Sequence, residues 1–398
     1  MIDDCSNDGS IQICEDFAKN DDRIKIIRNK VNIGPGLSRN KGIKLANGKY
    51  IVFVDCDDSI CAQGLSKLWD AIVANRDPDM LKVDYNELLS NGQIIERKNE
   101  KDDCFIKVEK TIDFLKNYLK RNRIGFRAWE FVYKRSILEK NNILFGESRI
   151  WEDNEFTIKN FLHSKVIGYY RKPFYQYRTG LAGTLTCSHS DMWEQIIKAA
   201  ISMLGLYFEG LDLLYRNWIL KCVNSCILEF EDIAGAIRLD TIESNMALFE
   251  ILNNRLHLMN KYIKKDGLLW YLRRSINQET ILEFVTNKKK QAAMLIENNK
   301  EKIIFAFPAT RRGANILSIL QSDGYKVMGL LDNNKKKQGA WINKYPIFQP
   351  EIIRDTDNRE EIFIIISTAT KTTGKLLSAQ LMAYGLQPKK HFKCTWES

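Results

Sequence analysis

Four residues at the end of an apolar run have side chains that could bind a metal ion and a diphosphate. Residues 51–54 read IVFV, a run of strand length, and Asp55-Cys56-Asp57-Asp58 follows directly. In open α/β sheets, ligands bind beyond the carboxyl ends of strands. Carboxylates gathered there repel one another unless a positive group lies between them, and a divalent cation bridging to a diphosphate meets that need. Aspartate-rich loops also commonly cap the next helix, so this loop alone leaves both interpretations open.

Further short motifs accompany this loop in a fixed order. The chain opens with MIDDCSNDGS, residues 34–43 read GPGLSRNKGI at the start of a predicted helix, and residues 48–58 read GKYIVFVDCDD. Three later segments read YKRSILEKNNILF at 133–145, WEDNEF at 151–156 and YQYR at 175–178. Together these motifs resemble inverting glycosyltransferase family 2, of the GT-A fold, whose members commonly show DDxSxDGS, GxSxARNxGI and GxYIxFLDxDD. Gly36 and Ser38 stand where the family usually has Ser and Ala, and the resemblance covers residues 1 to about 190.

The resemblance implies roles for the residues that match the first three motifs. Asp4 would accept a hydrogen bond from the nucleotide base, most often uracil, with a turn or helix-cap aspartate as the alternative. Arg39 would approach the base or the diphosphate, because its fork of donors suits oxyanions, with a surface helix arginine as the alternative. Asp55 and Asp57 would form the DxD pair that binds the nucleotide-sugar. Asp57 would lie nearest a Mg²⁺ or Mn²⁺ ion, and Asp58 could share that task.

The WEDNEF segment would supply the catalytic base. An inverting transfer needs one carboxylate to remove a proton from the acceptor hydroxyl as it attacks the anomeric carbon. Asp153 is the predicted base and Glu152 the alternative, and either could instead cap a helix. Trp151 would form an apolar floor for a sugar ring or, equally, pack in the core. The expected donor is a nucleotide-diphospho-sugar, with a UDP-sugar first, and the expected acceptor is a glycan or a lipid-linked molecule in bacterial surface polysaccharide or glycan biosynthesis.

The beginning of the chain departs from the family pattern. Members usually start with a strand such as VSVIIPxYN, a helix and a second strand before the DD motif, whereas here Met1 and Ile2 directly precede Asp3. We therefore expect an N-terminally incomplete GT-A domain that lacks its first strand and helix. The alternative function is a non-catalytic, truncated or degenerate transferase that acts as a binding scaffold.

The elements that must position these residues follow from the hydrophobic pattern. The first 83 residues alternate between helix and strand patterns, with predicted helices at 10–18, 35–46 and 65–75, which favours a parallel sheet covered by helices. Residues 191–300 show apolar side chains at three- and four-residue spacing and predict a helical segment, which could support the fold, form a dimer surface or line an acceptor groove. The predicted domains are thus 1–190, 191–300 and 301–398.

Residues 301–398 resemble the small Rossmann-like domain appended to many polysaccharide-biosynthesis proteins. The segment from Val327 to Asn334 reads VMGLLDNN, and strands are predicted at 303–305, 327–331 and 362–366. The loop after the first strand has lost nearly all the glycines that a nucleotide-binding loop needs, although Arg311 and Arg312 could still hold a phosphate. Asp332 stands where a ribose-binding acid would lie. We expect a structural or regulatory domain rather than a dinucleotide-dependent enzyme.

Composition limits the class of protein and its partners. The chain has 398 residues, 44% of them hydrophobic and 28% charged, with a net charge of +10, which fits a folded protein of two or three domains. The basic residues are scattered and form no recognisable nucleic-acid motif, so we expect no nucleic-acid partner. Nine cysteines without a CxxC pair predict reduced thiols in the cytoplasm. No secretory signal and no run of about 18 apolar residues is seen; peripheral contact with the inner face of the cell membrane and a homo-oligomer remain options.

Overall fold

The structure, a computed structural model, divides into two compact units. It describes residues 1–74, 77–89, 92–96, 109–120, 126–179, 193–207, 211–237, 239–263, 278–296, 299–354, 356, 358–368 and 370–395. The first unit comprises Met1–Glu87, Ile94–Tyr177 and Lys198–Asn224. The second comprises Leu88–Gln93, Arg178–Ile197 and Ser225–Ser398. Each unit is described separately below.

The first unit contains a seven-stranded sheet with the central order β3-β8-β5-β9-β4. Its strands are β3 (Tyr50–Val52), β4 (Ser59–Ile60), β5 (Met80–Leu89), β6 (Ile94–Ile95), β7 (Glu109–Lys110), β8 (Phe131–Lys134) and β9 (Val166–Thr179). The pairs β3–β8, β5–β8, β4–β9 and β7–β9 are antiparallel. The expected parallel sheet is therefore wrong for these pairs. Because β3 and β5 both run antiparallel to the intervening β8, they point the same way without pairing with each other.

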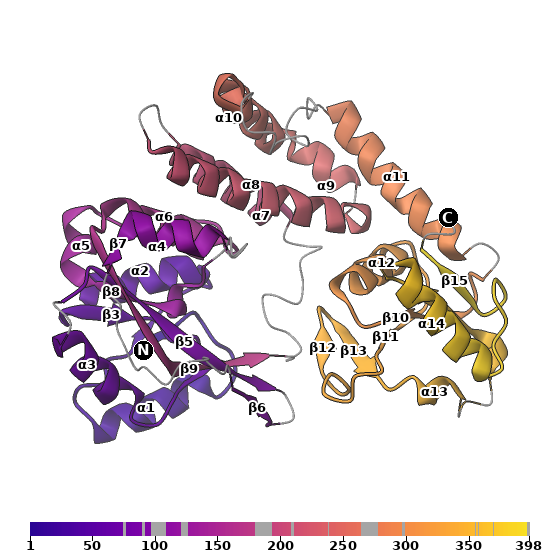
Figure 1. Cartoon of the computed structure of the whole chain (residues 1–398), viewed down its shortest axis with the longest axis horizontal. Coiled ribbons are helices and arrows are strands. Elements are labelled where there is room, and N and C mark those ends of the chain that lie inside the picture. Colours follow the sequence, from indigo (N-terminus) through magenta and orange to yellow (C-terminus); the bar gives the residue numbers. More distant parts are fainter. Residues whose placement is uncertain are drawn as a thin grey trace. The chain divides into compact units, whose positions relative to one another are not determined.

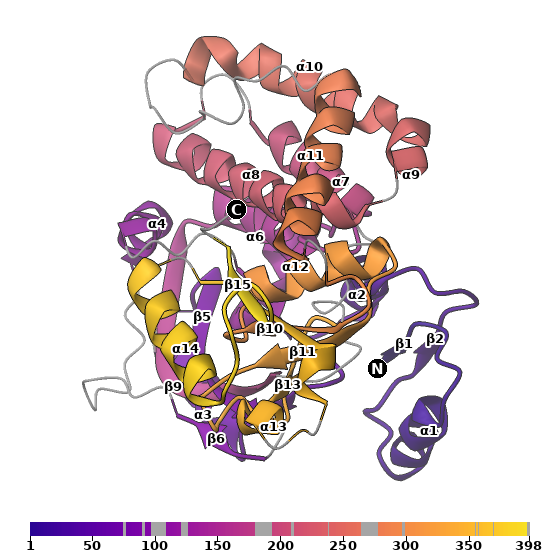
Figure 2. The ribbon, with the colours of Figure 1, turned by 90° about the vertical axis from the view of Figure 1, so that its right-hand side faces the viewer.

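The first residues form a small parallel pair of their own. β1 (Ile2–Asp3) pairs with β2 (Ile27–Arg28), and α1 (Ser10–Asn20) connects them. Figure 2 shows α1 beside this pair. Helix α1 has no buried residue, so its position depends on its two connections to the strands rather than on packing.

Helices and aromatic side chains hold the first unit together. The remaining helices of its α/β part are α2 (Pro35–Leu45), α3 (Gly64–Ala74), α4 (Thr111–Lys120), α5 (Arg135–Lys140) and α6 (Glu152–His163). α4 and α6 lie side by side, with the rings of Phe114 and Phe161 5.9 Å apart (Figure 1). Trp218, from α8 (Leu213–Ile233), packs edge-on against Phe126 and Phe161 at 5.2 and 5.1 Å. The core of this unit thus includes a side chain from the helical segment.

The helices predicted between residues 191 and 300 are present. They are α7 (Trp193–Gly205), α8, α9 (Leu239–Ser244), α10 (Met246–Ile263) and α11 (Gln278–Ile296). In the described part of the chain, no helix combines the length and the apolar character that crossing a membrane requires.

The second unit contains a doubly wound sheet of order β12-β13-β11-β10-β14-β15. Its elements are β10 (Ile303–Phe307), α12 (Arg311–Ser322), β11 (Val327–Leu331), β12 (Trp341–Ile342), β13 (Tyr345–Phe348), α13 (Glu351–Arg354), β14 (Ile362–Ile366), α14 (Lys371–Ala383) and β15 (Phe392–Cys394). All pairs are parallel except β12–β13. Leu317 and Leu320 of α12 pack on one face, and Leu377 and Leu381 of α14 pack on the other. The predicted α/β class is confirmed, as are the helical middle segment and the small α/β domain predicted for residues 301–398.

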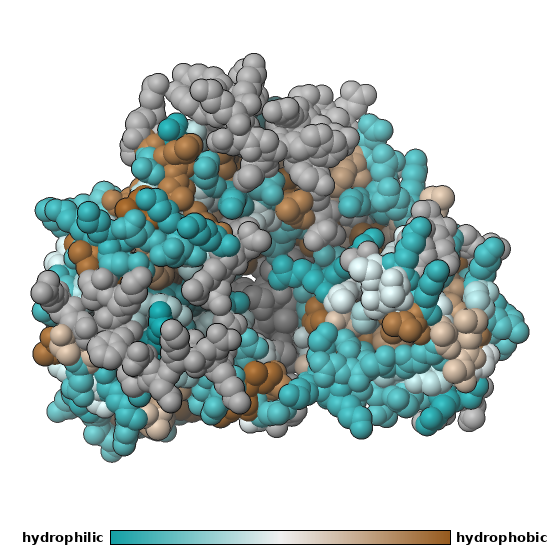
Figure 3. Space-filling model, in the orientation of Figure 1, coloured by the Kyte–Doolittle hydropathy of each residue, from teal (hydrophilic) through white to brown (hydrophobic). Residues whose placement is uncertain are grey.

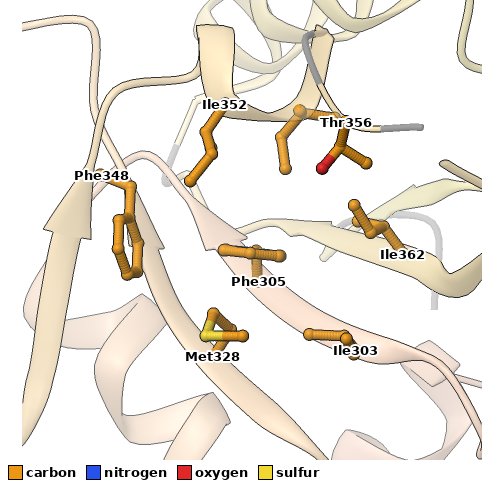
Figure 4. Close-up of a pocket in the computed structure, with 8 residues that line it drawn as sticks. Ile303, Phe305, Met328, Phe348, Ile352, Thr356 and Ile362 are labelled. Atoms are coloured by element: carbon orange, nitrogen blue, oxygen red, sulfur yellow. The ribbon is translucent and has the colours of Figure 1, made fainter. Parts of the chain in front are cut away.

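An apolar pocket of about 170 Å³ lies in the second unit. Figure 4 shows the side chains that line it, which come from β10, β11, β13, β14 and the α13 region: Ile303, Phe305, Met328, Phe348, Ile352, Ile353, Thr356 and Ile362. Hydrophilic side chains predominate on the face of this unit seen in Figure 3. The pocket contains no charged side chain, so it offers nothing that would bind a phosphate.

Candidate active site

The aspartate loop that follows β3 is held in place by a tyrosine from β9. The backbone N–H of Asp55 donates to the Tyr175 hydroxyl at 3.0 Å, and that hydroxyl donates to Asp58 Oδ2 at 2.8 Å. The Asp58 N–H closes a turn on the Asp55 carbonyl at 3.1 Å. The Tyr175 ring stacks on Trp129, with centroids 4.3 Å apart and planes 2° from parallel. One hydroxyl on a rigid ring therefore fixes both ends of the loop.

Arg39 of α2 joins this loop to the acidic start of α6. Its guanidinium donates to Asp55 Oδ1 at 2.7 Å, to Glu152 Oε1 at 2.7 Å and to Asp153 Oδ1 at 3.1 Å. Burial alone would lower the pKa of Arg39, but the nearby charges of Asp153, Asp55 and Glu152 outweigh it and raise that pKa above its ordinary value. Three predicted site carboxylates thus bind one cation, Arg39. The family resemblance implies instead that Arg39 approaches the nucleotide base or the diphosphate.

The helix that carries Arg39 is pinned against the segment that leads into α6. The buried side chain of Asn40 donates to the Phe145 carbonyl at 3.0 Å and accepts from the Phe145 N–H at 2.8 Å. The guanidinium of Arg39 lies 5.4 Å from the Phe145 ring centroid, within the range of a cation–π contact. A Cβ at Gly36 would approach Glu152 Cγ and the Gly146 carbonyl to 3.1 Å each. This close approach explains why the smallest residue replaces the family's usual Ser at position 36.

Burial and crowding change the proton affinity of the acid pair. Burial, followed by the charge of Asp153, raises the pKa of Glu152 to about 8, against the opposing effect of Arg39. Burial also raises the pKa of Asp153, and the charge of Asp55 adds to that effect while Arg39 opposes it. The Asp153 side chain is 19% exposed and that of Glu152 only 7%. Asp153 is therefore the more accessible of the two carboxylates.

Asp57 and Asp58 are the carboxylates of the loop that form no ion pair with Arg39. Across the described parts of the chain, no group of three or more His, Cys, Asp or Glu side chains is placed to hold one. Asp55 is engaged by Arg39, whereas Asp57 is partly exposed and makes neither a hydrogen bond nor an ion pair with any described residue. Mg²⁺ commonly takes only one or two protein carboxylates beside substrate phosphates, so these two side chains are the candidates for holding one.

Asp4 binds the backbone near the start of α2 instead of facing outward. Its Oδ1 accepts from Asn29 Nδ2 at 2.8 Å and from the Ile33 N–H at 2.9 Å, and its Oδ2 accepts from the Gly34 N–H at 2.8 Å. Burial would raise the pKa of Asp4, but these hydrogen bonds outweigh it and lower that pKa. The side chain therefore has a structural task here, and a base ligand would have to share oxygens that already accept three hydrogen bonds.

Trp151 occupies a strained position beside the acid pair. It is the residue before α6 and adopts a left-handed backbone, with φ 61° and ψ 5°. A bulky residue rarely adopts this conformation, and such strain is common next to functional sites. Its side chain is partly exposed. Trp151 therefore lies directly beside the acid pair. Its contact with a sugar ring stays a prediction.

Tyr175 is the site residue that the motif analysis missed. The sequence placed it in the YQYR segment without assigning it a role. It lies on β9 and pairs with Ile60 of β4, the strand that directly follows the aspartate loop. Burial, with the charge of Asp55 as the next cause, raises its pKa above the ordinary value for tyrosine. Tyr175 and Tyr177 are two residues apart on one strand, so their side chains share a face of the sheet. The sequence could not show which loop that face meets.

Comparison with known proteins places this geometry in a family. The family described as glycosyl transferase family 2 matches residues 1–140. The chain is 28% identical over 231 residues to the putative glycosyltransferase EpsH of Bacillus subtilis, which covers 54% of this chain and 60% of EpsH. It is 30% identical over 179 residues to the uncharacterized glycosyltransferase EpsJ of the same organism. This alignment covers 45% of this chain and 51% of EpsJ.

A solved structure shares the fold. The structure of S. aureus TarS 1-349 in complex with UDP superimposes with a TM-score of 0.50 and 20% identity, over 73% of this chain and 81% of that one. At this identity the likeness concerns the fold alone. The chain spans only 60% and 51% of the lengths of EpsH and EpsJ, so their whole-protein properties do not transfer directly. The family match thus assigns residues 1–140 to glycosyl transferase family 2, and the likeness to TarS supports the GT-A fold expected for this part of the chain.

Proposed function

We propose that the first unit transfers a sugar from a nucleotide-diphospho-sugar to a hydroxyl of a glycan or lipid-linked acceptor, with inversion at the anomeric carbon. The observation that carries the proposal is the junction at Arg39, which brings the aspartate loop and the Glu152–Asp153 pair within 3.1 Å of one guanidinium. A donor-binding loop and a candidate base must lie this close if one carboxylate is to act at the carbon that the diphosphate leaves.

In the proposed reaction, the acceptor oxygen forms a bond to the anomeric carbon while the bond to the diphosphate oxygen breaks. Asp153 takes the proton from the acceptor hydroxyl, and the nucleoside diphosphate departs with the bonding electrons. The raised pKa of Asp153 suits this role, because a base is most effective when its pKa lies near the working pH. A Mg²⁺ or Mn²⁺ ion held by Asp57 and Asp58 would supply positive charge to the leaving diphosphate.

Uridine is the proposed nucleoside, and surface polysaccharide or glycan biosynthesis the proposed setting. The support is the DDxSxDGS-like opening of the chain and the UDP in the TarS structure of the same fold. Arg39 would hold Asp55 and the acid pair in register until the donor arrives. We propose this positioning role in place of the direct contact with base or diphosphate that the resemblance implies.

The test is UDP release from a panel of UDP-sugars by the full chain, with Mn²⁺ and with EDTA. Asp153→Asn should lower kcat by at least about 100-fold while UDP affinity is retained, and Asp57→Asn should abolish the metal dependence of UDP binding. Asp70→Asn, on the exposed side of α3, is the matched control and should behave like the wild type. The anomeric configuration of the product, read by NMR, tests inversion.

Two outcomes would contradict this function. Wild-type turnover in both Asp153→Asn and Glu152→Gln would exclude the acid pair as the base. Metal-dependent UDP binding with no release from any donor would favour the binding-scaffold alternative instead.

A further inference from the structure

A second candidate site lies in the second unit, at the carboxyl edge of its sheet. β11 lies on one side of β10 and β14 on the other, so the order of the strands reverses at β10. α12 follows β10 and α14 follows β14, and the two helices pack on opposite faces of the sheet. Both helices therefore begin at the edge where doubly wound sheets bind their ligands.

The charges at the two helix starts are the reverse of what a helix prefers. The first turn of α12 contains Arg311 and Arg312, that of α14 contains Lys371, and neither contains an acid. Cations at the positive end of a helix dipole are unfavourable unless an anion lies nearby. Arg311 lies 3.8 Å from Glu229. Arg312 and Lys371 form no ion pair with a residue that the structure describes.

Each helix start also presents backbone donors. Thr310 caps α12 by accepting from the Gly313 N–H at 3.1 Å, and Thr370 caps α14 by accepting from the Thr373 N–H at 3.3 Å. These caps leave the first N–H groups of each helix without an acceptor among the described residues. Such groups are the ordinary ligands of a bound phosphate.

A buried hydroxyl without a partner lies between the two helix starts. Ser367 directly follows β14, is 1% exposed, and its Oγ has no hydrogen-bond partner among the residues that the structure describes. Its N–H donates to the Phe307 carbonyl at the end of β10 at 2.8 Å. A Cβ at Gly313 would lie 2.7 Å from the Ser367 Oγ, so this hydroxyl points at the first turn of α12. An unsatisfied buried hydroxyl is costly and calls for a reason.

Asp332, the acid that follows β11 at this edge, is already ion-paired within the protein. It is therefore not available to bind the ribose of a dinucleotide. Asp332 is buried, accepts from the Asn334 N–H at 2.9 Å and pairs with Lys337 at 3.0 Å. The same ammonium also donates to the Ala309 carbonyl at 3.3 Å. A ribose-binding acid needs a carboxylate that is open to the ligand, and Asp332 is not. The remaining features suit an anion without a nucleoside requirement.

We propose that this edge binds the phosphoryl group of an anionic ligand. The phosphoryl group would accept hydrogen bonds from the first-turn N–H groups of α12 and α14 and from the side chains of Arg312 and Lys371. The Ser367 hydroxyl would join them after rotation about χ1. The site lies in the second unit and is independent of the sugar-transfer site. A phosphoryl group could reach it from a soluble phosphate compound or from a lipid headgroup, and the test separates these sources.

The test uses the full chain in EDTA, so that no divalent ion assists binding at the aspartate loop. Inorganic pyrophosphate is titrated by calorimetry, and vesicles with and without phosphatidylglycerol are used for co-sedimentation. Arg312→Gln/Lys371→Gln should weaken binding of the preferred probe roughly tenfold or more, because charge-assisted hydrogen bonds are lost. Lys300→Gln/Lys326→Gln, which removes two exposed cations that precede β10 and β11, should bind like the wild type.

Ser367→Ala separates a ligand contact from a structural role. Because its Oγ has no partner, the variant should unfold at the same or a higher temperature, yet bind the probe several-fold more weakly. Binding of pyrophosphate that depends on Arg312 and Lys371 assigns a soluble ligand, and vesicle binding with the same dependence assigns a lipid headgroup. Absence of both, or equal weakening in the control pair, would overturn the proposal.

Discussion

At the scale of single residues, Arg39 determines the charge balance of the candidate active site. One guanidinium faces three carboxylates, so the cluster carries excess negative charge, which a bound proton reduces. Burial makes that excess expensive. The pKa of Glu152, raised to about 8 by burial and by the charge of Asp153, indicates that the acid pair holds one proton at neutral pH. Binding of a cation beside Asp57 would change this balance.

The shared proton predicts a pH dependence of stability that Glu152→Gln removes. The folded pKa of Glu152, about 8, lies above its ordinary value of 4.5, so the folded protein holds this proton more tightly than the unfolded chain. The resulting stability is complete below about pH 4.5 and is lost as pH rises towards 8. Relative to the wild type, Glu152→Gln should therefore gain on the order of 2 kcal/mol in free energy of unfolding between pH 5 and pH 8.

Urea denaturation at pH 5, 6.5 and 8, in EDTA, measures this difference. Glu147→Gln, an exposed neighbour on the same segment, is the control and should follow the wild type at every pH. If the difference between Glu152→Gln and the wild type stays constant across these values, the proton is not held at Glu152.

At the scale of elements, β9 and the aspartate loop form one rigid assembly through Tyr175. The Tyr175→Phe variant keeps the ring stacked on Trp129 but removes the hydroxyl that bonds Asp55 and Asp58. We expect metal-dependent UDP affinity and kcat each to fall roughly five- to tenfold, in line with the loss of about 1–1.5 kcal/mol in hydrogen bonding.

Calorimetry and UDP release measure the two effects of Tyr175→Phe separately. Tyr177→Phe, two residues along the same strand, removes a hydroxyl with no described hydrogen bond and serves as the control. A loss of folding stability with unchanged affinity and kcat would reduce Tyr175 to a packing residue.

Local patterns predicted most single elements of this chain. The strands at Val327–Leu331 and Ile362–Ile366 have the predicted bounds, and α2 ends one residue before its predicted end. Each is encoded by spacing within a few residues. The place of β8 between β3 and β5 is not encoded locally, because strand order depends on contacts between distant segments.

The same limit applies to the candidate site. The motifs named Arg39, Glu152 and Asp153, but the ion pair of Arg39 with Glu152 joins residues 113 positions apart and needed the packing of α2 on α6. Asp4 shows the same limit. Its motif predicts a ligand contact, which stays a prediction, and the sequence could not show that the N–H groups of Ile33 and Gly34 also bond its carboxylate.

At the scale of the whole chain, each unit has its own core, and the helical segment contributes to both. Residues Lys198–Asn224 belong to the first unit and Ser225–Ser398 to the second, so the helices are not an independent third body in the contact pattern. Within the first unit, the Tyr215 hydroxyl also donates to the Phe161 carbonyl at 3.1 Å. The start of α8 is therefore bonded to α6, the helix that carries the acid pair.

This connection predicts that a substitution far from the acid pair in sequence will affect the first unit. Trp218 is fully buried and packs on Phe126 and Phe161, so Trp218→Ala leaves a large cavity beneath α6. The free energy of unfolding of the first unit should fall by about 3–5 kcal/mol. The proposed binding of UDP with Mn²⁺ to the folded unit should recover part of the loss by mass action. Leu228→Ala, a partly exposed position further along α8, should cost far less. If both variants lose the same stability and UDP recovers none of it, the start of α8 does not belong to the core that supports the site.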